Sequence, residues 1–259
     1  MNAFLNQLAF GWYPYLAVTV LIVGSILRFD ADQYSWRSQS SQFLRRRQML
    51  IGSNLFHMGV LVLFVGHFIG LLTPIWVFES LGVAHAAKQL LALIVGGIAG
   101  ISALVGCSML LHRRLFDPRI RQTSSVGDIA VLVLIWLQLV LGVLTIWWSM
   151  QHLSGDEMVA LMGWANAILT FDPTAPSRLT DTAVVFKLHI ILGLTLFLIT
   201  PFTRLVHIWS APVWFLFRPG YQIVRSLAPL SRKPTSPTRG PVIGASTQMR
   251  QQAESGQST

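Results

Sequence analysis

The stretch SNLFHMGVLVLFVGHFIGLLTP, residues 53–74, decides the fold of this chain. It lies within a longer segment, residues 48–78, that holds no charged side chain. About 20 apolar residues cross the hydrocarbon core of a bilayer as a helix, so we expect a membrane span over roughly residues 49–72. The two histidines of this stretch, His57 and His67, are ionisable groups inside a predicted span, where such groups are costly and usually functional.

The composition of the whole chain also indicates a membrane protein. Of its 259 residues, 53% are apolar and 11% carry a charge, whereas a soluble domain has about 25% charged residues. Four further apolar segments, about residues 1–27, 88–113, 128–148 and 183–209, are long enough to cross a bilayer. We therefore predict an all-α membrane protein with five transmembrane helices. The single cysteine excludes an internal disulfide, a protein-only Fe–S site and covalent C-x-x-C-H haem attachment.

Two other segments differ from the spans in length or composition. The apolar segment Met158–Phe171 is too short to cross a bilayer, and we expect an interfacial helix there. From Ser231 onward the chain is rich in Pro, Ser, Thr, Gly and Gln, which cannot bury a core. We therefore divide the chain into a membrane domain, residues 1–225, and a disordered cytoplasmic tail, residues 226–259.

Basic residues concentrate on one side of the predicted spans. Sixteen of the nineteen lysines and arginines fall between spans one and two, between spans three and four, or from the end of span five onward. Such a bias marks the cytoplasmic side of a membrane protein. We therefore expect a periplasmic N-terminus and a cytoplasmic C-terminus. The net charge of +9 then reflects orientation in the membrane, not binding to nucleic acid.

Four histidines lie within predicted spans, His57 and His67 on the second and His189 and His207 on the fifth. Because these spans run in opposite directions, the histidines pair by depth: His57 with His207 near the inside, and His67 with His189 near the outside. One ligand from each helix suits the two axial positions of a haem. Zinc would require carboxylate or thiolate companions that these pairs lack. We predict two non-covalent haems b whose bis-histidine ligation suits electron transfer.

Helical geometry fits the fifth span better than the second. Its histidines are 18 residues apart, which is five turns of a continuous helix, so they would face one side about 27 Å apart. The second-span histidines are 10 residues apart and point roughly 80° away from each other. Either the second span bends, with Gly59 and Gly66 available for a bend or for close ring approach, or the two haems meet it from different sides.

At these residues the chain resembles the gamma subunit of respiratory nitrate reductase, a di-haem membrane cytochrome b. The resemblance covers roughly residues 2–225. The matching stretches are RFDADQYSWRSQSSQ (28–42), SNLFHMGVLVLFVGHFIGLLTP (53–74), RRLFDPRIR (113–121) and KLHIILGLTLFLITPFTRLVHIWSAPV (187–213). The resemblance implies that His67 and His189 hold a distal, periplasmic haem, and that His57 and His207 hold a proximal, cytoplasmic haem.

The resemblance also implies an activity and partners. In that family the gamma subunit oxidises membrane quinol near the periplasmic haem. Electrons then pass through the cytoplasmic haem to an Fe–S (beta) subunit and a molybdenum-containing catalytic (alpha) subunit. The chain would thus be part of a quinol:nitrate oxidoreductase in the bacterial inner membrane, with the nitrate-reducing site on another chain. Lys88 matches a basic residue implicated at the quinol site, although its position alone would suit an ordinary interfacial lysine.

Two other functions are compatible with membrane histidines. The first is a cytochrome b anchor of a hydrogenase or formate dehydrogenase, in which we would not expect the stretches quoted above. The second is a permease or structural anchor without haem, in which the histidines hydrogen-bond between helices. A visible spectrum would separate the permease from both cytochromes, because only bis-histidine haem b gives a sharp reduced α-band.

Overall fold

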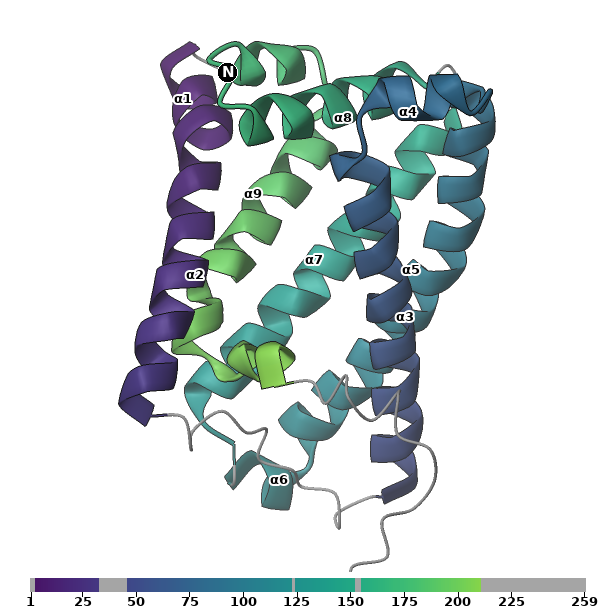
Figure 1. The fold of residues 1–259 in the computed structure, drawn as a ribbon. Coiled ribbons are helices and arrows are strands. Elements are labelled where there is room, and N and C mark those ends of the chain that lie inside the picture. Colours follow the sequence, from purple (N-terminus) through teal and green to yellow (C-terminus); the bar gives the residue numbers. More distant parts are fainter. Residues whose placement is uncertain (1–2, 33–45, 123, 152–154, 211–259) are drawn as a thin grey trace, which may run out of the picture. The chain divides into compact units, whose positions relative to one another are not determined.

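The structure, a computed structural model, describes residues 3–32, 46–122, 124–151 and 155–210. All of these belong to the first of two units of the chain, Met1–Ala211. The second unit, Pro212–Thr259, lies outside the described residues, and so does the predicted tail from residue 226 onward. Every element in the described ranges is helical (Figure 1), which agrees with the all-α prediction.

Five helical segments in these ranges are long and apolar enough to cross a membrane, as predicted. They are Ala3–Asp32, Arg46–Leu72, Ala86–Phe116, Val126–Gln151 and Val184–Phe202. In chain order the elements are α1 (Ala3–Gln7), η1 (Leu8–Trp12), α2 (Tyr13–Asp32), α3 (Arg46–Leu72), α4 (Ile75–Ser80), α5 (His85–Phe116), α6 (Pro118–Gln122), α7 (Val126–Gln151), α8 (Asp156–Leu169), η3 (Ala175–Leu179), α9 (Val184–Ile199), η4 (Thr200–Phe202) and η5 (Arg204–Ser210). The element η1 is a π-helical turn, and η3, η4 and η5 are 3₁₀ helices.

The first span contains a π-helical turn because of a proline. Pro14 has no N–H to donate to the carbonyl four residues earlier, which belongs to Phe10. The Tyr13 N–H instead reaches the Leu8 carbonyl, a bond across five residues that defines a π turn. The indole of Trp164 on α8 donates to the Phe10 carbonyl at 2.9 Å and satisfies it. The carbonyl that Pro14 leaves without a helical partner thus bonds the first span to α8.

Glycines bring α3 and α5 into close contact. A Cβ at Gly59 would lie 2.5 Å from the Ala99 carbonyl oxygen, and one at Gly106 would overlap the backbone of Phe56. Small residues of this kind let two membrane helices approach closely. Gly59 therefore serves contact between helices and does not bend α3, which is one continuous helix. A Cβ at Gly66 would meet no described atom within 4 Å.

The fifth span is shorter than predicted. We expected one helix over residues 183–209, but α9 ends at Ile199 and is followed by the two 3₁₀ segments η4 and η5. Pro201 explains the break, because it has no N–H for the helix and disfavours helical backbone at the residue before it. The expectation that His189 and His207 lie five turns apart on one helix is therefore wrong.

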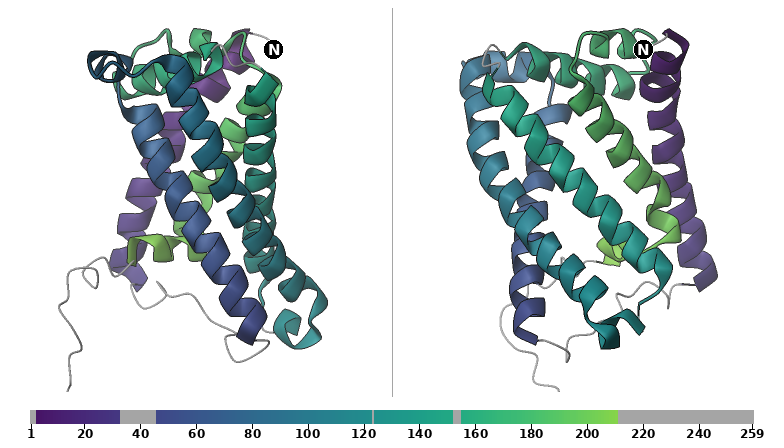
Figure 2. Two further views of the ribbon diagram at one scale, coloured as in Figure 1. Left: turned by 90° about the vertical axis from the view of Figure 1, so that its right-hand side faces the viewer. Right: turned by 180° about the vertical axis from the view of Figure 1, so that it is seen from behind.

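Short helices cover one end of the spans, where α4 and α8 lie, while α6 lies at the other end (Figures 1 and 2). The predicted helix at residues 158–171 is confirmed as α8, which begins two residues earlier and ends two residues earlier. Phe171 follows it with a φ of 58°, and the Asp172 N–H bonds the Ala167 carbonyl at 2.9 Å. This is a Schellman ending with a left-handed residue. The buried Trp164 and Leu179 join α8 and η3 to the first span through Phe10.

Candidate functional site

The rings of His67 on α3 and His189 on α9 lie next to each other. Their centroids are 6.2 Å apart and their planes are inclined by 35°. A metal–imidazole bond is about 2.0–2.1 Å, and a ring nitrogen lies roughly 1 Å from its centroid, so two imidazoles on opposite sides of one metal ion place their centroids roughly 6 Å apart. The structure therefore brings together the pair predicted from depth, at a separation that one shared iron would require.

Three of the four histidines hold one ring hydrogen in a defined place. Each has its Nδ1 atom against a backbone carbonyl three or four residues earlier, at 2.7 Å for His67 and 2.8 Å for His57, with a further such contact for His207. A carbonyl oxygen can only accept, so Nδ1 must carry the hydrogen. The Nε2 atom then keeps a free lone pair, which is the tautomer that metal-ligating histidines adopt.

His189 is positioned by α7. The side-chain amide of Gln138 donates to the His189 carbonyl oxygen at 3.1 Å, and its nitrogen lies 3.3 Å from His189 Nε2. One turn along α7, a Cβ at Gly142 would lie 3.2 Å from Cε1 of the same ring. The Nδ1 atom of His189 is buried without a hydrogen-bond partner. A ring held this tightly, with a nitrogen that no described atom satisfies, fits a ligand of a non-protein group.

The inner pair, His57 and His207, is not joined as the outer pair is. His57 is exposed on α3, with the Phe56 ring edge-on at 5.1 Å, and His207 lies on η5. Within the described ranges, no hydrogen bond or ring contact joins their side chains. The break at Pro201 separates η5 from the axis of α9. The pairing of His57 with His207 therefore stays a prediction.

Lys88, near the start of α5, contacts α3 one turn beyond His67. Its ammonium donates to the Gly70 carbonyl at 3.2 Å, contacts Met162 Sδ at 2.8 Å, and sits 3.5 Å from the centroid of the Phe78 ring. Gly70 follows His67 by three residues, about 4.5 Å along α3. The hollow beside Lys88 has no room for a water molecule, and its lining residues are Ile75, Phe78, Lys88, Met158, Val159 and Met162.

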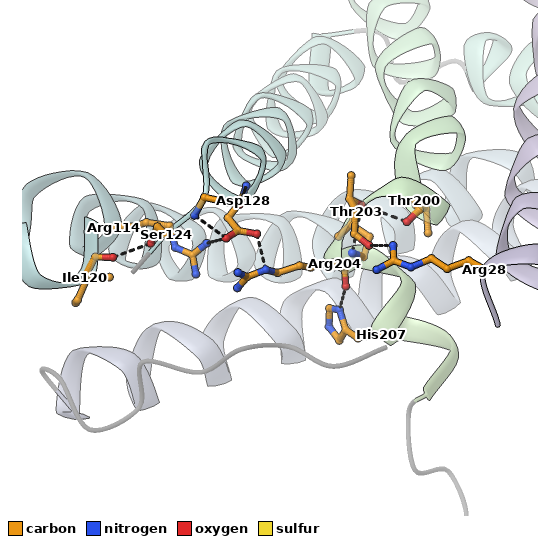
Figure 3. A network of polar contacts seen from close by, with 11 residues as sticks. Arg28, Arg114, Ile120, Ser124, Asp128, Thr200, Thr203, Arg204 and His207 are labelled. Carbon is orange, nitrogen blue, oxygen red and sulfur yellow. Dashed lines mark hydrogen bonds and ion pairs between the residues drawn. The ribbon is translucent and has the colours of Figure 1, made fainter. Parts of the chain in front are cut away.

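A buried carboxylate at the other end of the spans was not identified from the sequence. Asp128 lies in the first turn of α7. Its side chain is 5% exposed and forms ion pairs with Arg204 and, at 4.0 Å, with Arg114 (Figure 3). It also caps its own helix, because Ser125 and Asp128 exchange backbone and side-chain hydrogen bonds at 3.0 and 3.2 Å. An acidic residue at the edge of an apolar span on the arginine-rich side was the available signal.

These features define the chain as a multi-span membrane protein that holds imidazole rings between its helices. Comparison with known proteins gives the family. The family model described as "Nitrate reductase gamma subunit" matches residues 6–227. The chain belongs to the nitrate reductase gamma subunit family, as the resemblance implied, and it is accordingly an integral membrane subunit of an oxidoreductase complex.

Named relatives support this assignment. Over 86% of its length the chain is 49% identical to the respiratory nitrate reductase 1 gamma chain of Escherichia coli K12, of which it covers 98%. Over 82% of its length it is 38% identical to the nitrate reductase gamma chain of Bacillus subtilis 168, of which it covers 95%. A more distant match, 28% identical over 62% of this chain and 46% of the relative, is the Hdr-like menaquinol oxidoreductase cytochrome b-like subunit of Archaeoglobus profundus. These matches favour the nitrate reductase assignment over the hydrogenase anchor and the permease.

Proposed function

We propose that this chain oxidises membrane quinol and transfers the electrons, through two haems b, to an Fe–S (beta) subunit and a molybdenum-containing (alpha) subunit on the cytoplasmic side. The observation that carries the proposal is the 6.2 Å separation of the His67 and His189 rings, which come from different helices. Family membership supplies the partners, because a gamma subunit of a nitrate reductase acts within a complex.

The residues present fit haem b. His67 and His189 would hold the outer haem, and His57 and His207 would hold the inner one. When bound, haem supplies a one-electron iron couple, and two histidine ligands leave no open position for oxygen. The chain's own contribution is to fix the rings: the Nδ1 contacts hold three of them in the ligating tautomer, and Gln138 and Gly142 hold the fourth.

Lys88 is proposed to bind quinol next to the outer haem. Its ammonium is a hydrogen-bond donor that can bind a quinol oxygen, and it contacts the carbonyl of Gly70, which is one turn from His67 along α3. The hollow must open to admit a ring, and the unbranched side chains of Met158 and Met162 are suited to moving aside. Each quinol oxidised gives up two electrons and two protons, and both protons would leave on the Lys88 side.

The proposed orientation puts Lys88 on the periplasmic side of the inner membrane. It is supported by the basic residues of the described segments. Arg28, Arg114 and Arg204 lie near one another (Figure 3), on the ends of elements that lie away from α4 and α8 (Figure 1). Moving electrons inward from the outer side adds to the membrane potential, at about 2.3 kcal/mol per charge per 100 mV.

Single alanine variants of the four histidines test the proposal. In the purified complex we expect two haems per chain, with His67→Ala and His189→Ala removing one and His57→Ala and His207→Ala removing the other. His112→Ala is the matched control, because His112 is an exposed span histidine that contacts Phe116 and belongs to neither pair. An unaltered reduced spectrum in all four variants would refute haem ligation. Purification of the chain without Fe–S and molybdenum subunits would refute the proposed partners.

A further inference from the structure

The segment that carries His207 cannot hold itself in place. After α9 ends, Thr203 adopts extended backbone with φ −124° and ψ −179°, and η5 then runs from Arg204 to Ser210 as a 3₁₀ helix. Such helices have poorer hydrogen-bond geometry than α-helices and are seldom longer than a few residues. The position of His207 must therefore depend on side chains from other helices.

Arg204 connects His207 to the start of α7. The guanidinium of Arg204 forms an ion pair with Asp128, and the carbonyl of the same residue accepts the Nδ1 hydrogen of His207 (Figure 3). Arg204 thus contacts Asp128 through its guanidinium and His207 through its backbone carbonyl. Loss of the ion pair would remove one of the contacts that fix the backbone carrying this carbonyl.

Asp128 is itself fixed, and each of its carboxylate oxygens has its own partner. Oδ1 pairs with the guanidinium of Arg204, while Oδ2 accepts the Ser125 N–H at 3.0 Å and lies 4.0 Å from Arg114. With its side chain 5% exposed, this carboxylate is largely removed from water. Breaking a buried ion pair by removing one charge is strongly destabilising, because the other charge stays uncompensated.

A second arginine, on α2, hydrogen-bonds the backbone where the fifth span breaks after α9. Arg28, near the end of α2, donates to the Pro201 carbonyl at 2.6 Å and the Thr203 carbonyl at 2.8 Å. The end of a helix leaves its last carbonyls without partners in the helix, and Arg28 satisfies two such groups around the break. The segment before His207 is therefore anchored to α2 as well as to α7.

We propose that Asp128 is the positioning residue for His207: it fixes Arg204, and Arg204 sets the orientation of the ring through its backbone carbonyl. This rests on the proposed function, in which His207 would hold the inner haem. Partners that orient metal-ligating histidines typically contribute 10–100-fold to metal affinity. Because Asp128 acts through Arg204, we expect an effect at the lower end of that range, about tenfold.

The test uses Asp128→Asn and Arg204→Gln in the whole complex. Each should weaken binding of the haem that His207→Ala removes by about tenfold, and should shift its midpoint potential and its low-spin ferric EPR signal. The signal lost in His67→Ala should stay at its wild-type position. Asp128→Glu, which keeps the charge, should restore most of the inner signal. Asp172→Asn is the matched control, because it removes an exposed Asp–Arg pair, at 3.4 Å to Arg178, between α8 and η3.

The outcomes separate the two proposals. If His207→Ala keeps both haems, the ligand assignment in the proposed function is wrong. If His207→Ala removes one haem but Asp128→Asn keeps its wild-type potential and EPR signal, the positioning role is wrong. The outer haem reports folding of the same chain, so equal loss of both signals in Asp128→Asn would show a general structural role and would also overturn the positioning role.

Discussion

Gly142 gives the sharpest test of the outer site, because adding one methyl group has two opposite effects. Gly142→Ala should stabilise α7 by about 0.5–1 kcal/mol, since alanine favours a helix more than glycine. The new Cβ would lie 3.2 Å from His189 Cε1, whereas carbon atoms in optimal contact are about 3.5–4.0 Å apart. The ring must therefore move by a few tenths of an ångström, and metal–ligand distances tolerate about 0.2 Å.

We expect the outer haem to be bound about tenfold more weakly in Gly142→Ala, a loss of about 1.4 kcal/mol, while the protein's thermal stability without haem stays the same or rises. The assay is haem content by spectrum, together with the midpoint potential of each haem. Gly97→Ala on α5 is the matched control, because a Cβ there would meet no described atom within 4 Å. A wild-type outer-haem potential in Gly142→Ala would refute the argument that this glycine makes room for the His189 ring.

Further predictions address the proposed quinol residue Lys88, the hydrogen bond from Gln138 to His189, the α3–α5 interface and the turn after α8 that contains Asp172. Lys88→Ala should impair quinol oxidation while leaving both haems reducible by dithionite, and wild-type turnover with quinol would remove Lys88 from the site. Gln138→Leu removes the donor to the His189 carbonyl and should shift the potential of the outer haem alone, as measured by redox titration. Gly59→Val should prevent assembly of α3 against α5, because its Cβ would lie 2.5 Å from a backbone oxygen, so we expect little folded protein by fluorescence-detected gel filtration. Hydrogen bonds from the Thr174 hydroxyl and amide lower the pKa of Asp172. Their stabilising effect should therefore be complete at neutral pH and should be lost in strong acid, as the pH falls through that lowered pKa. The protection of the Thr174 amide against hydrogen exchange, measured relative to its intrinsic rate at each pH, should fall in the same range, and protection that stays constant would contradict the prediction.

The five spans could be predicted because a bilayer requires a fixed length of apolar helix. Charge-free windows of about 20 residues therefore locate membrane helices well. The proximity of His67 to His189 could be predicted for a related reason: alternating spans fix the depth of each residue, so these two histidines were expected at similar heights. The structure adds that their rings are neighbours, which depth alone does not establish.

The break in the fifth span shows where this reasoning failed. Counting apolar residues treats residues 183–209 as one helix, but Pro201 ends it. The proline was visible in the sequence and predicts a stop or a kink. What the chain does after the stop could not be predicted, because the course of η5 depends on Arg28 and Asp128, which lie far away in sequence and meet this segment only in the folded protein.

The two ends of the spans hold their histidines by different physical means. His189 lies on a continuous helix and is set by shape, through Gly142 and the Gln138 amide. His207 lies on a short 3₁₀ segment, and its ring orientation depends on the ion pair between Asp128 and Arg204. A methyl group should therefore perturb the outer ring and leave the inner ring in place, and loss of one carboxylate charge should do the reverse. Because the Asp128 carboxylate is buried, added salt should screen its pairing only weakly, so the inner site should be sensitive to substitution but not to ionic strength.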